Sequence, residues 1–236
     1  MDFKMIHIDE TDSTNRWLRC HSGVRTCVVA EYQTAGKGCG KNSWESERGK
    51  NLTFSVMVHP TDIPASRQFL ISEIVSVALC ETLDPYAGQQ LQIKWPNDIY
   101  HGDRKLCGIL IENRLQGNTI KDSIIGIGLN VNQETFLSDA PNPVSLCQIV
   151  GHDIDRDALL RDFLEHLAAA FTREDIPSVY RRLLYRKEGF HAYEDAKGRF
   201  LAKVHDVCDD GHLVLLDTEG TLRTYAFKEV QFVIKD

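Results

Sequence analysis

The 236-residue sequence lacks the features that mark membrane, secreted and DNA-binding proteins. No run approaches the roughly 18 apolar residues of a membrane-spanning helix, and no apolar segment of the signal-peptide kind follows the first residues. The formal net charge of −7 disfavours nonspecific binding to nucleic acids or anionic membranes. Only a dozen residues precede Ser13, which belongs to the first polar segment discussed below, and these residues already carry a strand pattern. We therefore expect no N-terminal helix-turn-helix domain, no DNA as partner and no membrane association.

The seven cysteines are odd in number and widely scattered. None belongs to a Cys-x-x-Cys pair or lies at zinc-ligand spacing from a histidine, which disfavours both a disulfide framework and a structural zinc site. Reduced thiols predict a cytoplasmic location. The hydrophobic share of 42% and the charged share of 26% are those of an ordinary globular protein, long enough for one full domain and a small second one.

Six β-branched runs predict the strands of a central sheet, and two helical patterns predict segments that cover it. The runs are 5–8, 26–31, 51–58, 91–94, 105–112 and 124–131. One helix is expected within 65–83, and a second follows Asp155, which can cap it. Short alternating strands at 200–207, 212–216, 221–227 and 230–234 predict a small β-barrel. The expected fold is α+β, with a mixed central sheet flanked by helices in residues 1–186 and a barrel in residues 187–236.

The segment 36–44, Gly-Lys-Gly-Cys-Gly-Lys-Asn-Ser-Trp, combines flexible backbone, cationic side chains and a flat aromatic ring. Glycine amides can converge on an oxyanion, lysines can neutralise phosphate, and the indole of Trp44 can stack on a base. The spacing matches neither the Walker phosphate loop nor the dinucleotide fingerprint. Taken alone, such a run is more often a solvated surface loop than a nucleotide site.

Two polar segments offer hydrogen-bonding groups to a neutral ligand. Asp-Ser-Thr-Asn at 12–15 precedes a helical pattern, for which helix capping is the simpler interpretation, although one cap does not need four polar residues. Gln33 ends a strand just before the glycine loop. Its amide suits a urea or amide group, but an ordinary polar residue at a sheet edge is equally compatible.

The segment Lys-Trp-Pro-Asn-Asp at 94–98 places a lysine at the end of an apolar strand. If a carboxylate must meet a nucleoside triphosphate, a cation about 4 Å away supplies on the order of 4 kcal/mol at an effective dielectric near 20. Lys94 is the candidate for this task. The alternative is a surface ion pair between Lys94 and Asp98, worth at most about 1 kcal/mol. Glycines within 105–112 and 126–132 permit the close approach of a ligand, or mark a bulge or tight crossing.

Five segments in one order resemble the biotin protein ligase family. They read Asp-Ser-Thr-Asn, Glu-Tyr-Gln-Thr-Ala-Gly-Lys-Gly, Lys-Trp-Pro-Asn-Asp, Lys-Leu-Cys-Gly-Ile-Leu-Ile-Glu and Gly-Ile-Gly-Leu-Asn-Val-Asn. The resemblance covers residues 9–132 strongly, and the C-terminal part fits the family's SH3-like β-barrel by its layout. The resemblance implies that the first part of the chain is a catalytic domain related to class II aminoacyl-tRNA synthetases and lipoate ligases.

The resemblance also implies a reaction. Biotin and MgATP would form biotinyl-5′-AMP and pyrophosphate, and a lysine of a biotin carboxyl carrier protein would then take the biotinyl group. ATP, Mg²⁺ and biotin would act as substrates, without a bound prosthetic group. The biotin-binding residues would be Ser13, Thr14, Asn15, Gln33, Lys37, Gly38, Cys39, Lys94 and Gly108. The nucleotide-binding residues would be Lys37, Trp44, Lys94, Asn97, Gly128 and Asn130. Lys94 would be catalytic, and no metal ligand is assigned.

The glycine loop departs from the family pattern, which commonly reads Gly-Arg-Gly-Arg/Gln-Arg-Gly. Here Lys37, Cys39 and Gly40 replace the arginines, and Lys41 falls where a glycine is usual. Lysine lacks the bidentate fork of arginine and cysteine offers no comparable donor, so we expect faster escape of the adenylate. A lipoate or octanoate ligase on the related fold and a noncatalytic biotin- or nucleotide-binding module remain alternatives. Both a monomer and a homodimer are compatible with the sequence.

Overall fold

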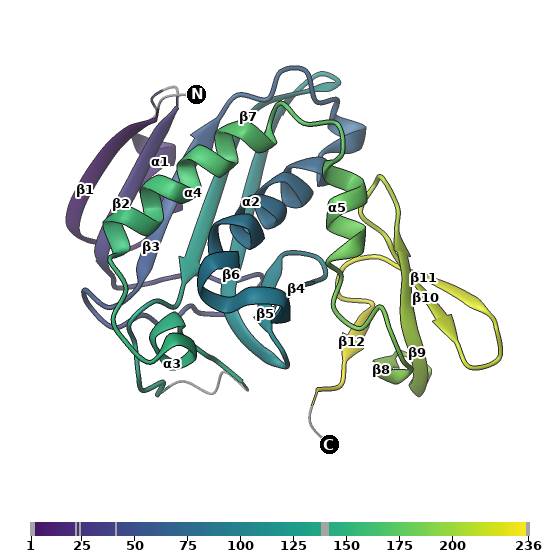
Figure 1. Cartoon of the computed structure of the whole chain (residues 1–236). Coiled ribbons are helices and arrows are strands. Elements are labelled where there is room, and N and C mark those ends of the chain that lie inside the picture. The colour runs from purple at the N-terminus through teal and green to yellow at the C-terminus, as the bar shows by residue number, and fades with distance from the viewer. Residues whose placement is uncertain (1–2, 22, 24, 41, 138–141, 235–236) are drawn as a thin grey trace.

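The computed structural model describes residues 3–21, 23, 25–40, 42–137 and 142–234. Its framework is a seven-stranded mixed sheet followed in sequence by a five-stranded antiparallel sheet (Figure 1). Lys41 of the glycine loop lies outside the described residues. Within the described part of the chain, no helix has the length and apolar character needed to cross a bilayer.

The seven-stranded sheet has the order β1-β2-β3-β7-β6-β5-β4. Its strands are β1 (Lys4–Thr11), β2 (Thr26–Gln33), β3 (Leu52–Val58), β4 (Leu91–Lys94), β5 (Asp98–His101), β6 (Arg104–Gln116) and β7 (Thr119–Leu129). β1 and β2 run parallel, and the other neighbouring strands run antiparallel. All six predicted runs form strands, and β5 is a further strand that the sequence analysis did not predict.

Helices cover both faces of this sheet. They are α1 (Thr14–Cys20), α2 (Phe69–Ala87), α3 (Leu146–Val150), α4 (Arg156–Ala170) and α5 (Ile176–Arg182). α2 and α4 lie side by side across one face, whereas α1 packs on the other against β2, β3 and β7 (Figure 1). The predicted cap of α4 is confirmed, because the Asp155 carboxylate accepts hydrogen bonds from the backbone amides of Asp157 and Ala158.

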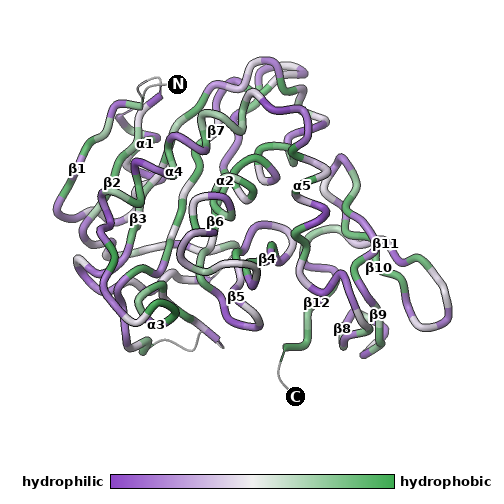
Figure 2. Tube along the Cα trace, in the orientation of Figure 1, coloured by the Kyte–Doolittle hydropathy of each residue, from purple (hydrophilic) through white to green (hydrophobic). Residues whose placement is uncertain are grey.

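β3 is buried at every position because both of its faces are covered. Phe54 points toward α4, where its ring meets Phe163 edge to face at 5.5 Å between centroids. On the opposite face Met57 joins a smaller apolar cluster with Leu18 of α1. Figure 2 shows that α2 is hydrophobic over most of its length, as its contacts with α4, α5, β4 and β5 require.

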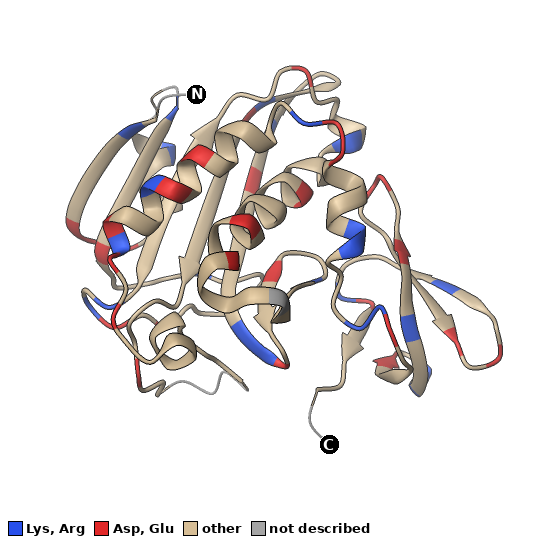
Figure 3. Cartoon of the chain, viewed as in Figure 1, with Lys and Arg blue, Asp and Glu red and all other residues tan. Residues whose placement is uncertain are grey.

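The five-stranded sheet has the order β11-β10-β9-β8-β12. Its strands are β8 (His191–Asp195), β9 (Gly198–Val207), β10 (Leu213–Asp217), β11 (Leu222–Tyr225) and β12 (Val230–Phe232). The four predicted C-terminal strands are present, and β8 is additional. The expected boundary at 186/187 falls between α5 and β8. Acidic and basic residues are interspersed along both parts of the chain in the view of Figure 3.

The two sheets share one continuous apolar core, which includes Tyr193, Val204 and Leu215 of the second sheet. Arg186 strengthens the junction. Its guanidinium donates to the carbonyls of Ala192 and Val233 at 2.9 and 2.8 Å. The second sheet is therefore held close to the end of the first.

Candidate active site

A cavity of about 1040 Å³ lies on the face of the first sheet that α1 partly covers, and it extends to the second sheet. Its wall contains every residue that the sequence analysis assigned to a ligand: Ser13, Thr14, Asn15, Gln33, Lys37, Gly38, Cys39, Trp44, Lys94, Asn97, Gly108, Gly128 and Asn130. Segments far apart in sequence therefore meet at one place. The individual roles assigned to these residues remain predictions.

A buried hydrogen-bond network joins the start of α1 to β2 and β3. The backbone amide and the hydroxyl of Thr14 donate to Gln33 Oε1 at 2.8 and 3.1 Å. Ser55 Oγ lies 2.6 Å from both Thr14 Oγ1 and Asn15 Oδ1. The Asn15 amide is oriented from its other side, because its Nδ2 donates to Glu112 at 2.9 Å.

This network contains more acceptors than hydrogens. Three pairs of oxygen atoms lie at hydrogen-bond distance: Thr14 with Gln33, Thr14 with Ser55, and Ser55 with Asn15. The hydroxyls of Thr14 and Ser55 supply only two hydrogens for these three contacts. One acceptor lone pair of the network therefore remains available for a hydrogen from a ligand. Because Gln33 Oε1 is used by Thr14, the Gln33 NH₂ group is the donor directed elsewhere. The site thus suits a neutral ligand that carries both an N–H donor and a carbonyl acceptor.

Ser13 stands at the N-cap position of α1, but its side chain makes no capping hydrogen bond. Asp12 is also engaged, since its carboxylate accepts from the Ser13 amide and pairs with Arg16, both at 2.7 Å. The interpretation of this segment as a simple helix cap is therefore wrong. The side chains of Ser13, Thr14 and Asn15 instead line the cavity.

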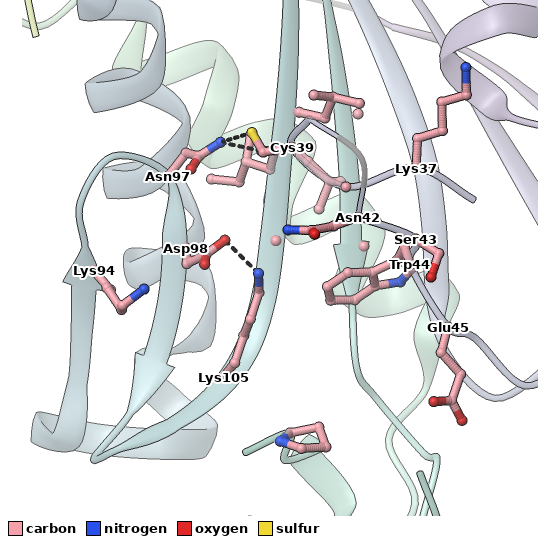
Figure 4. A pocket seen from close by; sticks show the side chains of 18 of the residues that line it. Lys37, Cys39, Asn42, Ser43, Trp44, Glu45, Lys94, Asn97, Asp98 and Lys105 are labelled. Carbon is pink, nitrogen blue, oxygen red and sulfur yellow. Dashed lines mark hydrogen bonds and ion pairs between the residues drawn. The ribbon is translucent and has the colours of Figure 1, made fainter. Parts of the chain in front are cut away.

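Lys94 lies between aromatic rings. Its Nζ is 5.3 Å from the centre of the Tyr100 ring and 5.0 Å from that of Phe232. Asp98 pairs instead with Lys105, whose Nζ lies 2.8 Å from Oδ1 (Figure 4). The alternative of an ion pair between Lys94 and Asp98 is wrong.

The environment of Lys94 favours the approach of an anion. Burial lowers the pKa of Lys94; the nearby Asp98 carboxylate opposes this shift, and the charges of Lys105 and Arg186 add to it. No carboxylate of a described residue lies within ion-pair distance of its Nζ. An anionic ligand would offset the cost of burying this cation.

Two glycines make room for the indole of Trp44. Gly108 and Gly128 are directly opposite each other in the β6–β7 register. A Cβ atom on Gly128 would lie well within 3.0 Å of Trp44 Cε2, and one on Gly108 would lie 2.9 Å from Trp44 Cζ3. Lys105 Nζ covers the indole at 5.6 Å from its centre. In this structure the space above the glycines thus holds a flat ring, and their predicted contact with a substrate stays a prediction.

The glycine loop is closed by backbone hydrogen bonds from Gly38 to Asn42 and from Trp44 to Gly36, at 2.8 and 2.9 Å. Cys39 Sγ lies 3.6 Å from Asn97 Nδ2, which also donates to the carbonyl of Ile109. The Lys37 side chain is exposed and extends away from the Lys94, Asp98 and Lys105 group (Figure 4).

Asn130 sits deeper in the wall of the cavity. Its Nδ2 donates to the carbonyl of Val144 at 3.0 Å, whereas its buried Oδ1 has no hydrogen-bond partner. An acceptor of this kind suits a donor on a ligand or a hydrated cation.

Several residues of the cavity and of the hydrogen-bond network beside it were not identified from the sequence. Ser55 was detectable as a polar residue inside an apolar run, and Lys105 as the first residue of a motif. Phe227, Lys228 and Phe232 of the second sheet also line the cavity, and no local pattern marked them.

The sequence profile of the Biotin/lipoate A/B protein ligase family matches residues 8–130. This chain belongs to that family. The expected resemblance and the expected α+β fold are thereby confirmed.

Three relatives illustrate the likeness of this chain to known proteins. The bifunctional ligase/repressor BirA of Bacillus subtilis is 31% identical over 216 residues, which cover 85% of this chain but 64% of that protein. The chain therefore spans less than two thirds of the BirA length. The biotin–[acetyl-CoA-carboxylase] ligase of Paracoccus denitrificans is 31% identical over 172 residues, or 69% of each protein. The solved biotin protein ligase of Aquifex aeolicus, in complex with biotin and ATP, has a TM-score of 0.81 and 23% identity over 97% of each chain, which shows a shared fold.

Proposed function

We propose that this protein is an ATP-dependent biotin–protein ligase. It activates biotin as biotinyl-5′-AMP and transfers the biotinyl group to a lysine of a biotin carboxyl carrier protein. The Paracoccus relative named as a biotin–[acetyl-CoA-carboxylase] ligase supports this assignment, as does the Bacillus ligase/repressor.

The hydrogen-bond network around Ser55 favours the binding of biotin over that of other acids. The ureido group of biotin has two N–H donors and one carbonyl acceptor. One N–H group matches the surplus acceptor of the network, and the carbonyl matches the NH₂ group of Gln33. A lipoyl or octanoyl tail has no N–H group, and it would leave these buried polar atoms unpaired at a cost of about 1–3 kcal/mol each.

Lys94 is placed to act in the first step. A carboxylate oxygen of biotin attacks the α-phosphorus of ATP, an O–P bond forms, and the bond to the β-phosphate breaks with loss of pyrophosphate. The half-buried ammonium of Lys94 faces the cavity without a carboxylate partner and can lie between the two anions. Asp98 neutralises Lys105 and thereby leaves Lys94 as an uncompensated charge.

In the second step the uncharged amine of a carrier lysine attacks the biotinyl carbonyl. The amide bond forms, the mixed anhydride bond breaks, AMP leaves, and the amine nitrogen loses a proton. Mg²⁺ enters as part of the MgATP substrate.

The cellular setting belongs to the same proposal. Burial raises the pKa of the Cys27 and Cys80 thiols to about 12, so these thiols remain protonated and unreactive. All seven cysteines are unpaired. Unpaired thiols suit a reducing cytoplasm, where biotin-dependent carboxylases and ATP are found.

Pyrophosphate exchange into MgATP tests the adenylation step. We expect exchange with biotin, and none with lipoate or without an acid. Exchange with lipoate alone would assign the protein to lipoate activation. If the folded protein shows no exchange with any acid, a noncatalytic binding module would be favoured. Lys94→Ala should slow exchange at least about a hundredfold, whereas Lys121→Ala, an exposed lysine of β7, should not.

A further inference from the structure

The turn between β11 and β12, residues 226–229, forms part of the cavity wall. Phe227 and Lys228 line the cavity. The Phe227 ring lies 6.0 Å from that of Trp95, in an edge-to-face arrangement. Glu229 stabilises the turn, because its carboxylate accepts a hydrogen bond from the amide of Ala226 at 2.7 Å. The second sheet is thus in direct contact with the cavity.

Lys228 lies against the glycine loop. A Cβ atom on Gly40 would lie within 3.0 Å of Lys228 Nζ and 3.3 Å from Lys228 Cε. The ammonium therefore occupies the space that a side chain at residue 40 would fill. The Lys37 side chain of the loop extends away from the Lys94 and Asp98 group (Figure 4). Lys228, by contrast, brings a cation to the loop from the other sheet.

The backbone of Lys228 is unfavourable for a lysine. Its φ of 73° lies in the left-handed region, which glycine adopts without strain. Strain at a residue that lines a cavity indicates that the side chain has a function. Lys228 makes no ion pair with any described carboxylate, so its charge remains available to a ligand.

We propose that Lys228 binds phosphate oxygens of the nucleotide beside the glycine loop. The second sheet then contributes a charged group to the nucleotide site, in addition to the apolar contacts of Phe227 and Phe232. This inference rests on the proposed function, because ATP is the polyanion that the ligase reaction requires. The proposed role of Lys228 is distinct from that of Lys94, which lies between Tyr100 and Phe232.

Lys228→Gly separates function from stability, because glycine removes the charge and also relieves the backbone strain. We expect α,β-methylene-ATP, titrated calorimetrically with saturating biotin, to bind about tenfold more weakly to the variant, as loss of one charge contact predicts. The affinities for adenosine and for biotin should not change, and the melting temperature should stay the same or rise. Lys228→Arg should retain most of the affinity.

Lys197→Gly is the matched control. This lysine lies in the turn between β8 and β9 of the same sheet but not in the cavity, so its loss should leave nucleotide affinity unchanged. If Lys228→Gly fails to fold, Lys228→Asn replaces it, since asparagine tolerates a positive φ and is neutral.

Equal affinity of the wild type and Lys228→Gly for α,β-methylene-ATP would overturn the inference. Equal weakening for adenosine, or a lowered melting temperature, would also overturn it and would assign a structural role to Lys228. In each of these cases biotin-dependent pyrophosphate exchange by the wild type would leave the proposed function standing. A wild type that neither binds nucleotide nor exchanges pyrophosphate would refute the proposed function itself.

Discussion

Glu73 provides a prediction about pH and stability. It lies in α2, is 4% exposed, and its Oε1 has no hydrogen-bond partner. Burial raises the pKa of Glu73 from 4.5 to about 7, against the opposing charges of Arg181 and Arg67 and with the support of Asp209 and Asp206. In the unfolded chain the carboxyl loses its proton near 4.5, whereas in the folded protein it keeps the proton to about pH 7.

The sign of the effect follows from this difference. The free energy of unfolding falls as the pH rises from about 4.5 to about 7, and then stays level. At about 1.4 kcal/mol for each pH unit between 4.5 and about 7, the loss from this one group is at most about 3.5 kcal/mol.

Glu73→Gln removes the titrating group. Urea unfolding at about pH 5 and about pH 8 should show that the wild type loses up to about 3 kcal/mol more than the variant between the two conditions. Glu165→Gln, at an exposed position of α4, should keep the wild-type loss. An identical pH dependence in Glu73→Gln and the wild type would refute the assignment of this effect to Glu73.

Three further predictions concern the cavity. Cys39→Arg should slow the dissociation of biotinyl-5′-AMP about tenfold, because guanidinium donates a bidentate fork; an unchanged rate in a chase experiment would contradict this. Gly128→Ala should weaken nucleotide binding at least about tenfold, since its Cβ would displace the Trp44 indole; unaltered affinity would show that the indole position does not matter. Ser55→Ala should weaken biotin binding about tenfold in calorimetry, whereas Ser123→Ala, which removes a buried hydroxyl without a partner, should not; similar losses in both would argue against the network.

The sequence predicted well those features that depend on neighbouring residues. Apolar β-branched runs marked the long strands, and Asp155 marked the start of α4. The site residues were found together because their motifs lie at strand ends and in a glycine loop. β5 was missed, since it has only four residues and begins at Asp98, directly after Pro96 and Asn97.

The features that were missed depend on contacts between distant segments. The ion pair between Asp98 and Lys105 was not predicted, because the β5–β6 pairing, with its irregularity after Ile99, brings Lys105 to that carboxylate. The hydrogen bonds of Ser55 depend on which face of β3 it occupies. Lys228 is distant from the glycine loop in the sequence, and only the packing of the second sheet places it there. Hydrophobic patterning carries no signal for such contacts.

The stack of Trp44 on Gly108 and Gly128 also bears on how this sequence can change over generations. A larger residue at either glycine has no room while the indole is present. A smaller residue at position 44 would uncover both glycines and leave an empty space on the sheet. A single substitution at any of these three positions is therefore unfavourable. We expect the three residues to be kept together in related sequences, or to be replaced together.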